Sequence, residues 1–233
     1  MLTYSNLQKI LQEFFWEALN NKPHICGVCC LYLLTNILVI FFVDLNMSAF
    51  EFVAVLFSVI VGLAISHLLS AASELIEIYS RVKIYWVNAV WFVTIFIWDI
   101  FSWWGMWALN SLEYWDYPSF FLIVVNLSGI YLMTTLVLPK PNESGQVDLK
   151  KHFFLVHRIF FIIISYNFVS IVLINHFLFF KPIISPFTIM PFLLTFLSFY
   201  GSLTKSEKYH GFLSVFALIS LIIFMSLDIT QIR

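Results

Sequence analysis

Asp99 is the residue whose type and position most strongly suggest chemistry. It lies within the apolar segment Phe96–Phe101. A carboxylate at the centre of a bilayer costs roughly 2.5–3.5 kcal/mol on insertion scales, so intramembrane acids usually face the protein interior and serve ion or proton pathways. Because removal from water disfavours the charged form, a neutral acid is expected at this depth. Asp99 is therefore either a titrating or coordinating group, or a protonated acid whose hydrogen bond holds two helices together.

Three uncharged polar residues are expected close to the depth of Asp99. At a helical rise of about 1.5 Å per residue, Asp99 lies roughly 21 Å from one end of its apolar segment. By the same rise, Asn126, Tyr166 and Asn167 lie roughly 18–22 Å from the corresponding ends of theirs. The sequence thus predicts a polar layer at mid-membrane with Asp99 as its ionisable member. The alternative is generic hydrogen bonding between helices, at about 1 kcal/mol for each bond.

His67 is the deepest histidine, roughly 13 Å from the end of its segment by helical rise. An imidazole there could relay protons or bind a metal or haem, or it could simply form a hydrogen bond between helices. Haem ligation by two histidines needs a partner at matched depth on a facing helix, and the sequence offers no good pair. The group His24, Cys26, Cys29 and Cys30 has metal-binding side chains, but adjacent helical residues point apart. We predict no metal and no cofactor.

Small residues recur every four positions between residues 54 and 70: Ala54, Ser58, Gly62, Ser66 and Ser70. This spacing places them on one helix face, where small side chains let helix backbones approach closely in lipid. The sequence predicts a helix-packing stripe. The alternative is that the serine hydroxyls line a polar path.

The composition excludes a water-soluble protein. The chain has 233 residues, of which 61% are hydrophobic and 11% charged, against about 45–50% apolar and 25% charged in soluble domains. Its formal charge of −1 gives no basic surface for nucleic acid. Seven apolar stretches lie near 26–43, 49–73, 84–108, 118–138, 153–176, 186–204 and 210–229. We predict an all-α, polytopic transmembrane helix bundle of about seven spans, forming one domain over 23–233, because backbone groups in lipid must be satisfied within each segment.

The first 22 residues have a different pattern. Leu7, Ile10, Leu11 and Phe14 fall on one helical face, with charged residues among the other positions. Residues 1–22 are predicted to form an amphipathic helix that lies on the membrane surface.

Basic residues predict the orientation of the chain. In a seven-span arrangement nine of them fall on one side: Lys9, Lys22, Arg81, Lys83, Lys140, Lys150, Lys151, Lys205 and Lys208. Lys181 and Arg233 fall on the other. Because cytoplasmic loops are enriched in Lys and Arg, we expect a cytoplasmic N-terminus and an external C-terminus. The cationic side chains of 151–158, at Lys151, His152, His157 and Arg158, could hold anionic lipid headgroups.

The segment Met47–Leu69, followed by the Trp-rich segment Trp86–Trp107, resembles the beginning of a set of small multi-pass bacterial inner-membrane proteins of unknown function. The resemblance implies a bacterial inner-membrane location but no activity. Such proteins tend to begin where Met47 stands, and a chain that started there would have six spans.

No enzyme signature is present: the sequence has no nucleophile elbow, phosphate-binding glycine loop or HExxH motif. The first hypothesis is a small transporter or channel for protons, ions or a small solute, with Asp99 as the titrating group and Asn126, Asn167 and His67 assisting. The alternative is a non-catalytic scaffold or sensor that acts through a membrane-protein partner or a second copy of the chain. A water-filled cavity that reaches Asp99 would favour transport, and a dry core with an exposed face of small residues would favour assembly.

Overall fold

The computed structural model describes residues 48–112, 114–139, 146–182 and 186–229. The chain divides into the units Met1–Ser48 and Ala49–Arg233, and every helix described below belongs to the second. The predicted surface helix at 1–22, the first predicted span at 26–43 and the cysteine group lie outside the described residues.

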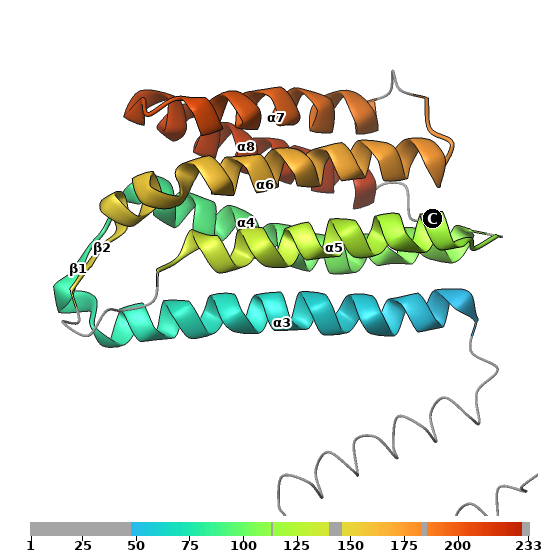
Figure 1. The fold of residues 1–233 in the computed structure, drawn as a ribbon, viewed down its shortest axis with the longest axis horizontal. Helices are drawn as coiled ribbons and strands as arrows, with labels where there is room; N and C mark the ends of the chain where they lie inside the picture. The colour runs from blue at the N-terminus through green and yellow to red at the C-terminus, as the bar shows by residue number, and fades with distance from the viewer. Residues whose placement is uncertain (1–47, 113, 140–145, 183–185, 230–233) are drawn as a thin grey trace, which may run out of the picture. The chain divides into compact units, whose positions relative to one another are not determined.

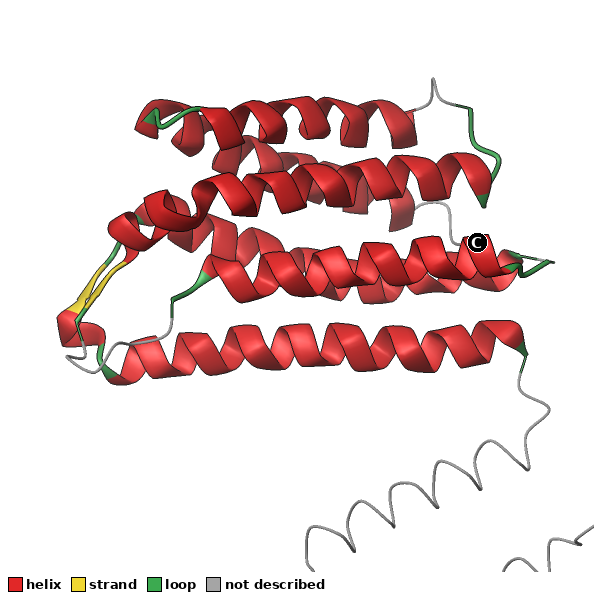
Figure 2. Cartoon of the chain, viewed as in Figure 1, coloured by secondary structure: helices red, strands yellow, loops and turns green. Residues whose placement is uncertain are grey.

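Helices make up almost the whole described part of the chain (Figures 1 and 2). They are α3 (Ala49–Glu77), α4 (Trp86–Gly105), α5 (Tyr117–Val137), α6 (Leu149–Phe177), α7 (Pro186–Leu203) and α8 (Glu207–Ile229), with short 3-10 helices at Tyr79–Arg81 and Met106–Ser111. Each of the last six apolar stretches of the sequence therefore coincides with a helix. The predicted all-α class is confirmed for the described residues.

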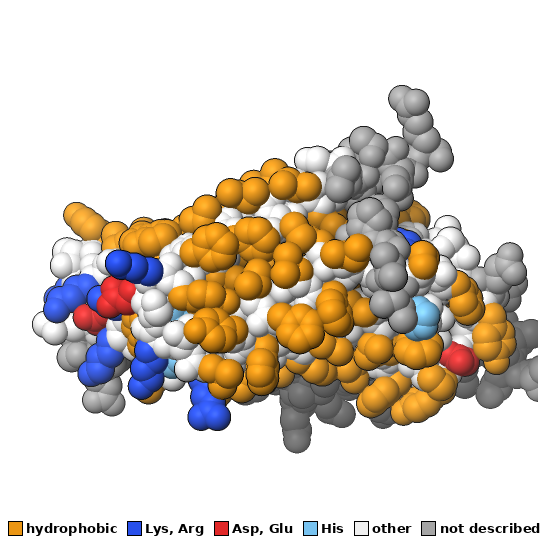
Figure 3. Space-filling model, turned by 90° about the horizontal axis from the view of Figure 1, so that it is seen from above, with side chains coloured by type: hydrophobic (Ala, Val, Ile, Leu, Met, Phe, Trp, Pro, Cys, Tyr) orange, Lys and Arg blue, Asp and Glu red, His pale blue; other side chains and the backbone are white. Residues whose placement is uncertain are grey.

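Five of these helices are long and apolar enough to cross a membrane: α3, α4 with the 3-10 turn that follows it, α5, α6 and α8 up to Ser226. Helix α7 is apolar but shorter, with 18 residues and Pro191 in its interior. Large hydrophobic side chains cover the sides of the bundle (Figure 3). Soluble proteins rarely expose continuous apolar surface of this extent, so these sides fit contact with lipid. The exact number of spans stays a prediction.

The helices pack in two layers. In Figure 1, α3, α5, α6 and α7 lie side by side, with α4 and α8 behind them. Helix α6 packs against both α5 and α7, and α3 packs against α5 and α4. Asp116 begins α5 by accepting a hydrogen bond from the backbone N–H of Ser119, at 2.9 Å. Asp148 begins α6 in the same way with the N–H of Lys151, at 3.0 Å. Both acids satisfy N–H groups that a helix leaves unpaired in its first turn.

The two ends of the bundle differ in charge. One end, which we call the basic end, carries Arg81, Lys83, Lys150, Lys151, Lys205 and Lys208. Figure 3 shows Lys and Arg side chains in blue gathered with acidic ones in red at one end of the molecule. Here the short strands β1 (Val82–Lys83) and β2 (Val147–Asp148) pair in parallel, with Val82 opposite Val147. The opposite end carries the connections after α4 and α6, with Lys181 as the basic residue among those described.

Candidate functional site

Asp99 is completely enclosed between helices. Its side chain, on α4, is 0% exposed. The hydroxyl oxygen of Thr134 on α5 lies 3.4 and 3.2 Å from the two carboxyl oxygens. The same oxygen lies 2.8 Å from the backbone carbonyl of Ile130. The Asp99 side chain thus joins α4 to α5.

The Thr134 hydroxyl has two kinds of acceptor within reach, the Asp99 carboxyl and the Ile130 carbonyl. A threonine hydroxyl has one proton to donate, and its shorter contact is to the carbonyl oxygen of Ile130. A protonated Asp99 can then donate its own proton to the Thr134 oxygen. The ion pairs among the described residues, Lys83–Asp148 and Lys150–Glu207, do not involve Asp99. The geometry accommodates a protonated acid between two helices, and the charge state of Asp99 stays a prediction.

Asn126 and Asn167 form a second polar cluster, between α5 and α6. The Asn167 amide donates to the backbone carbonyl of Asn126 at 3.0 Å, and the Asn126 amide donates to the hydroxyl of Ser170 at 2.6 Å. That hydroxyl donates in turn to the carbonyl of Asn167, at 2.7 Å. Tyr166, beside them, donates to the carbonyl of Val125 at 3.0 Å. The structure thus brings three of the predicted site residues together.

Asp99 belongs to a separate cluster from these residues. Its partner Thr134 follows Asn126 by eight positions on α5, which corresponds to about 12 Å along the helix. Counting residues predicted one polar layer, but the structure has two levels, one at Asp99 and Thr134 and one at the asparagine cluster. The reason is that the ends of the helices are not aligned along the bundle axis. In Figure 1 the basic end of α5 is set back from that of α3.

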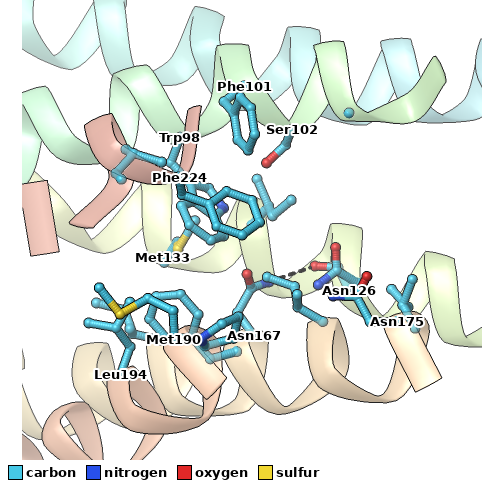
Figure 4. A pocket seen from close by; sticks show the side chains of 18 of the residues that line it. Trp98, Phe101, Ser102, Asn126, Met133, Asn167, Asn175, Met190, Leu194 and Phe224 are labelled. Carbon is cyan, nitrogen blue, oxygen red and sulfur yellow. Dashed lines mark hydrogen bonds between the residues drawn. The ribbon is translucent and has the colours of Figure 1, made fainter. Parts of the chain in front are cut away.

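A cavity of about 240 Å³ lies among α4, α5, α6, α7 and α8 (Figure 4). Its walls are mostly apolar, with aromatic and sulfur-containing side chains that include Trp98, Phe101, Met133, Phe168, Met190 and Phe224. Asn126 and Asn167 also line it, and it extends to Asn175 and Lys181 at the opposite end of the bundle. Asp99 is not among its lining residues. The cavity far exceeds the roughly 10–15 Å³ that a single water needs.

Three residues that line this cavity each carry a buried polar atom with no hydrogen-bond partner in the described part of the chain. These atoms are the indole N–H groups of Trp91 and Trp98 and the amide oxygen of Asn167. Trp91 is 3% exposed and Asn167 is 2% exposed. Leaving such a group unpaired costs about 1–3 kcal/mol. The residues around the cavity therefore carry two donors and one acceptor that are unpaired among the described residues.

Gly129 provides the close contact between α5 and α6 that the asparagine cluster needs. A Cβ atom at this position would lie 2.9 Å from the amide nitrogen of Asn167 and 3.0 Å from the ring of Tyr166. Those distances are too short for a methyl group. The glycine therefore leaves space for both α6 side chains.

His67 and the small-residue stripe lie away from the cavity walls. His67, on α3, is half-buried, and its Nδ1 has no partner among the described residues. The buried face of α3 is the adjacent row Val53, Phe57, Val61, Ala64 and Leu68.

The stripe itself is only partly covered. Gly62, Ser66 and Ser70 are exposed, and nothing lies within 4 Å of a Cβ built at Gly62. Ala54 and Ser58 are half-buried, and Ser58 accepts a hydrogen bond from Trp103 at 3.2 Å. A packing role for the whole stripe stays a prediction.

Several residues at these sites were not singled out from the sequence. Ser170 follows Asn167 by three positions, on the same helix face, so helical spacing was an available signal for it. Thr134, Trp91 and Gly129 carry no such signal, because only the way α5 meets its neighbours gives them a role. His210 is also buried, with its ring 5.8 Å from that of His157. No group of three or more His, Cys, Asp or Glu side chains suited to a metal occurs within the described residues.

Comparisons with known proteins give no match: no family model, curated protein or solved structure is similar to this chain. The resemblance of Met47–Leu69 to bacterial inner-membrane proteins therefore stays a prediction.

Proposed function

We propose that this protein binds a small, mostly apolar solute inside the membrane and carries it across the bilayer. The observation that supports the proposal is the cavity among α4–α8, with its three unpaired polar atoms. Ligand sites are typically apolar pockets of about 300–1,000 Å³ with a few convergent polar groups. At about 240 Å³, this cavity is somewhat smaller than that range. A suitable solute has an apolar body, a hydrogen-bond acceptor for Trp91 or Trp98 and a donor for Asn167.

The geometry favours a neutral solute over protons or ions. Asp99, the ionisable residue expected to titrate, is enclosed and does not line the cavity. The side chains that do line it are mainly hydrocarbon, and an ion would lose its hydration there without enough polar partners. We place the protein in a bacterial inner membrane with its basic end in the cytoplasm, because the basic residues follow the positive-inside pattern. The cavity then approaches the external end.

The binding part of the proposal can be tested with 1-octanol, which has an apolar chain and one hydroxyl that both donates and accepts. We expect 1-octanol to raise the thermal unfolding midpoint of the purified protein, since a ligand of the folded state stabilises it. The same concentration of n-octane should raise it less, because it leaves the polar atoms unpaired.

Two variants with the same substitution distinguish binding in the cavity from partitioning into detergent. Ala217→Leu places a larger side chain in the cavity wall, and it should abolish the 1-octanol effect. Ala89→Leu adds the same atoms at an exposed position on α4 and should leave the effect intact. An equal response in both variants would overturn the proposal. 1-Octanol crosses a lipid bilayer rapidly without any protein, so its efflux from vesicles would not report transport. Transport should therefore be assayed in proteoliposomes with a more polar analogue of any ligand found.

A second candidate function is assembly with another membrane protein. The exposed part of the stripe, at Gly62, Ser66 and Ser70, favours it, because small residues allow close approach of a partner helix. If another membrane protein or a second copy of the chain packs on this stripe, Gly62→Leu should dissociate that complex in mild detergent. Leu63→Phe, at an exposed neighbouring position, should not. If the mass of the purified protein in detergent is the same in both variants as in the wild type, this role of the stripe is excluded.

A further inference from the structure

A second hollow, of about 720 Å³, lies at the basic end of the bundle. Its walls come from the α3–α4 connection and from the start of α6, which the paired strands β1 and β2 hold together. The lining side chains include three cations, Arg81, Lys83 and Lys151, and one carboxylate, Asp148. This group of residues is separate from the cavity among α4–α8.

Among the described residues of this hollow, three cations stand against one carboxylate. Lys83 lies 4.0 Å from Asp148, the limit of an ion pair, and its side chain is 82% exposed. The other oxygen of Asp148 accepts the hydrogen bond that begins α6. Arg81 and Lys151 are in neither of the ion pairs found among the described residues. Lys150 is directed elsewhere, 2.6 Å from Glu207.

The start of α6 adds to this positive field. The first turn of a helix carries a partial positive charge that favours anions. The α6 helix begins at Leu149, at the edge of the hollow. His152 lies on the same wall, and its Nε2 is 3.0 Å from the carbonyl oxygen of Leu136. Because a carbonyl oxygen can only accept a hydrogen bond, the Nε2 of His152 carries the proton and donates it. This hydrogen bond to α5 fixes the orientation of the imidazole ring.

The hollow continues into lipid-facing surface. Leu155, one turn after Lys151, lines it and is 79% exposed. Ile159 and Ile162 follow on the same side of α6, at 59% and 44% exposed. Spacings of four and three residues keep these side chains on one helix face. A molecule held by the cations would therefore lie with its remaining length along a continuous apolar strip.

We propose that this hollow binds the phosphate headgroup of an anionic membrane phospholipid, with an acyl chain along Leu155, Ile159 and Ile162. Arg81 and Lys151 contact the phosphate, and Lys83 adds charge from β1. A soluble phosphate would satisfy the cations but would leave the apolar strip unused. The proposal revises the sequence expectation for this region: Lys151 and His152 belong to the site, whereas His157 and Arg158 are not among its lining residues.

The test is lipid binding by the purified full-length protein, measured by native mass spectrometry in mild detergent. Dioleoyl phosphatidylglycerol and dioleoyl phosphatidylcholine share their acyl chains and differ in headgroup charge. We expect the wild type to bind phosphatidylglycerol more tightly. In Arg81→Gln/Lys151→Gln that affinity should fall by about 25-fold, since each interfacial cation contributes about fivefold. Phosphatidylcholine binding should change little.

The control variant is Lys205→Gln/Lys208→Gln, which removes two exposed cations from the same end of the bundle but outside the hollow. It should retain the wild-type preference. An equal loss in both double variants would overturn the proposal, because the effect would then reflect general surface charge. Full competition by millimolar inorganic phosphate, with no contribution from the acyl chains, would also overturn it in favour of a soluble anion. If Arg81→Gln/Lys151→Gln does not fold, the wild type alone still tests the proposal. Equal affinity of the wild type for phosphatidylglycerol and phosphatidylcholine would overturn it.

Discussion

Asp99 joins two helices through a buried side-chain contact. Its carboxyl group is enclosed and contacts the hydroxyl of Thr134, which also contacts the carbonyl of Ile130. A neutral acid in this place needs only one hydrogen-bonding partner, and Thr134 supplies it. The contact joins α4 to α5 through side chains that span the helix interface.

We expect Asp99→Asn to fold with a free energy of unfolding within about 1 kcal/mol of the wild type, because the amide N–H can replace the acid proton at Thr134. Asp99→Ala removes the donor and leaves a small void, and it should cost about 1–3 kcal/mol. Denaturant titration in detergent, followed by circular dichroism, measures both. An Asn variant as unstable as the Ala variant would show that the negative charge itself is needed.

The pKa of Asp116 predicts how the start of α5 responds to acid. Hydrogen bonds from the side chain and the backbone N–H of Ser119 hold the pKa of this carboxyl below its usual value. Because the folded-state pKa is lowered, the stability that Asp116 contributes is present above the unfolded pKa of about 3.9. That contribution is lost as the pH falls through the lowered value.

The midpoint difference between the wild type and Asp116→Ala should therefore be largest near pH 7 and should decrease toward pH 2. Thermal unfolding across this range measures it. Asp116→Asn is the matched control, since asparagine also begins helices well but does not titrate. Its difference from Asp116→Ala should not depend on pH, and a parallel decrease in both comparisons would contradict the assigned role.

At the scale of helices, the contact between α5 and α6 depends on the absence of a side chain at Gly129. Gly129 leaves space for Asn167 and Tyr166, both of which are held by hydrogen bonds to α5. The polar cluster can form only because the two backbones approach closely there. Small residues have the same role at many helix contacts in membranes.

Replacing Gly129 by Ala should lower the free energy of unfolding by about 1–3 kcal/mol, because the new Cβ would overlap the Asn167 amide. Gly62→Ala is a matched control within a helix, with nothing within 4 Å of the new Cβ. It should be neutral or stabilising by about 0.5–1 kcal/mol, because alanine favours helix more than glycine does. Similar losses in both variants would indicate that the α5–α6 contact is not the cause.

The sequence predicted helices far better than it predicted which residues meet. Continuous apolar runs located α3 to α8 to within a few residues, because the length of a membrane-crossing helix is set by the bilayer. It also placed Asn126, Asn167 and Tyr166 at one depth, and the structure brings them together. It did not separate Asp99 from these residues. Depths were counted from the end of each residue's own segment, and such counts ignore that the basic end of α5 is set back from that of α3. Thr134 and Trp91 acquire their roles only through tertiary packing.

For the whole molecule, the enclosure of Asp99 predicts that protons do not cross through it. Proteoliposomes containing the wild type or Asp99→Asn should both show proton flux equal to that of protein-free liposomes under an imposed pH gradient. A pH-sensitive dye trapped inside the vesicles measures the flux. Conduction by the wild type that disappears in a folded Asp99→Asn protein would contradict this reading and would restore Asp99 as the site of transport.

The helices of this bundle also differ in length, and that difference reaches beyond the protein. Helices α3 and α6 have 29 residues each, whereas α7 has 18. At 1.5 Å per residue these correspond to about 43 Å and 27 Å. A hydrocarbon layer of about 30 Å is slightly thicker than α7 is long, whereas α3 and α6 exceed it and must tilt or extend into the headgroups. Hydrophobic mismatch therefore varies around the circumference of the protein, and thin bilayers should accommodate its α7 side best.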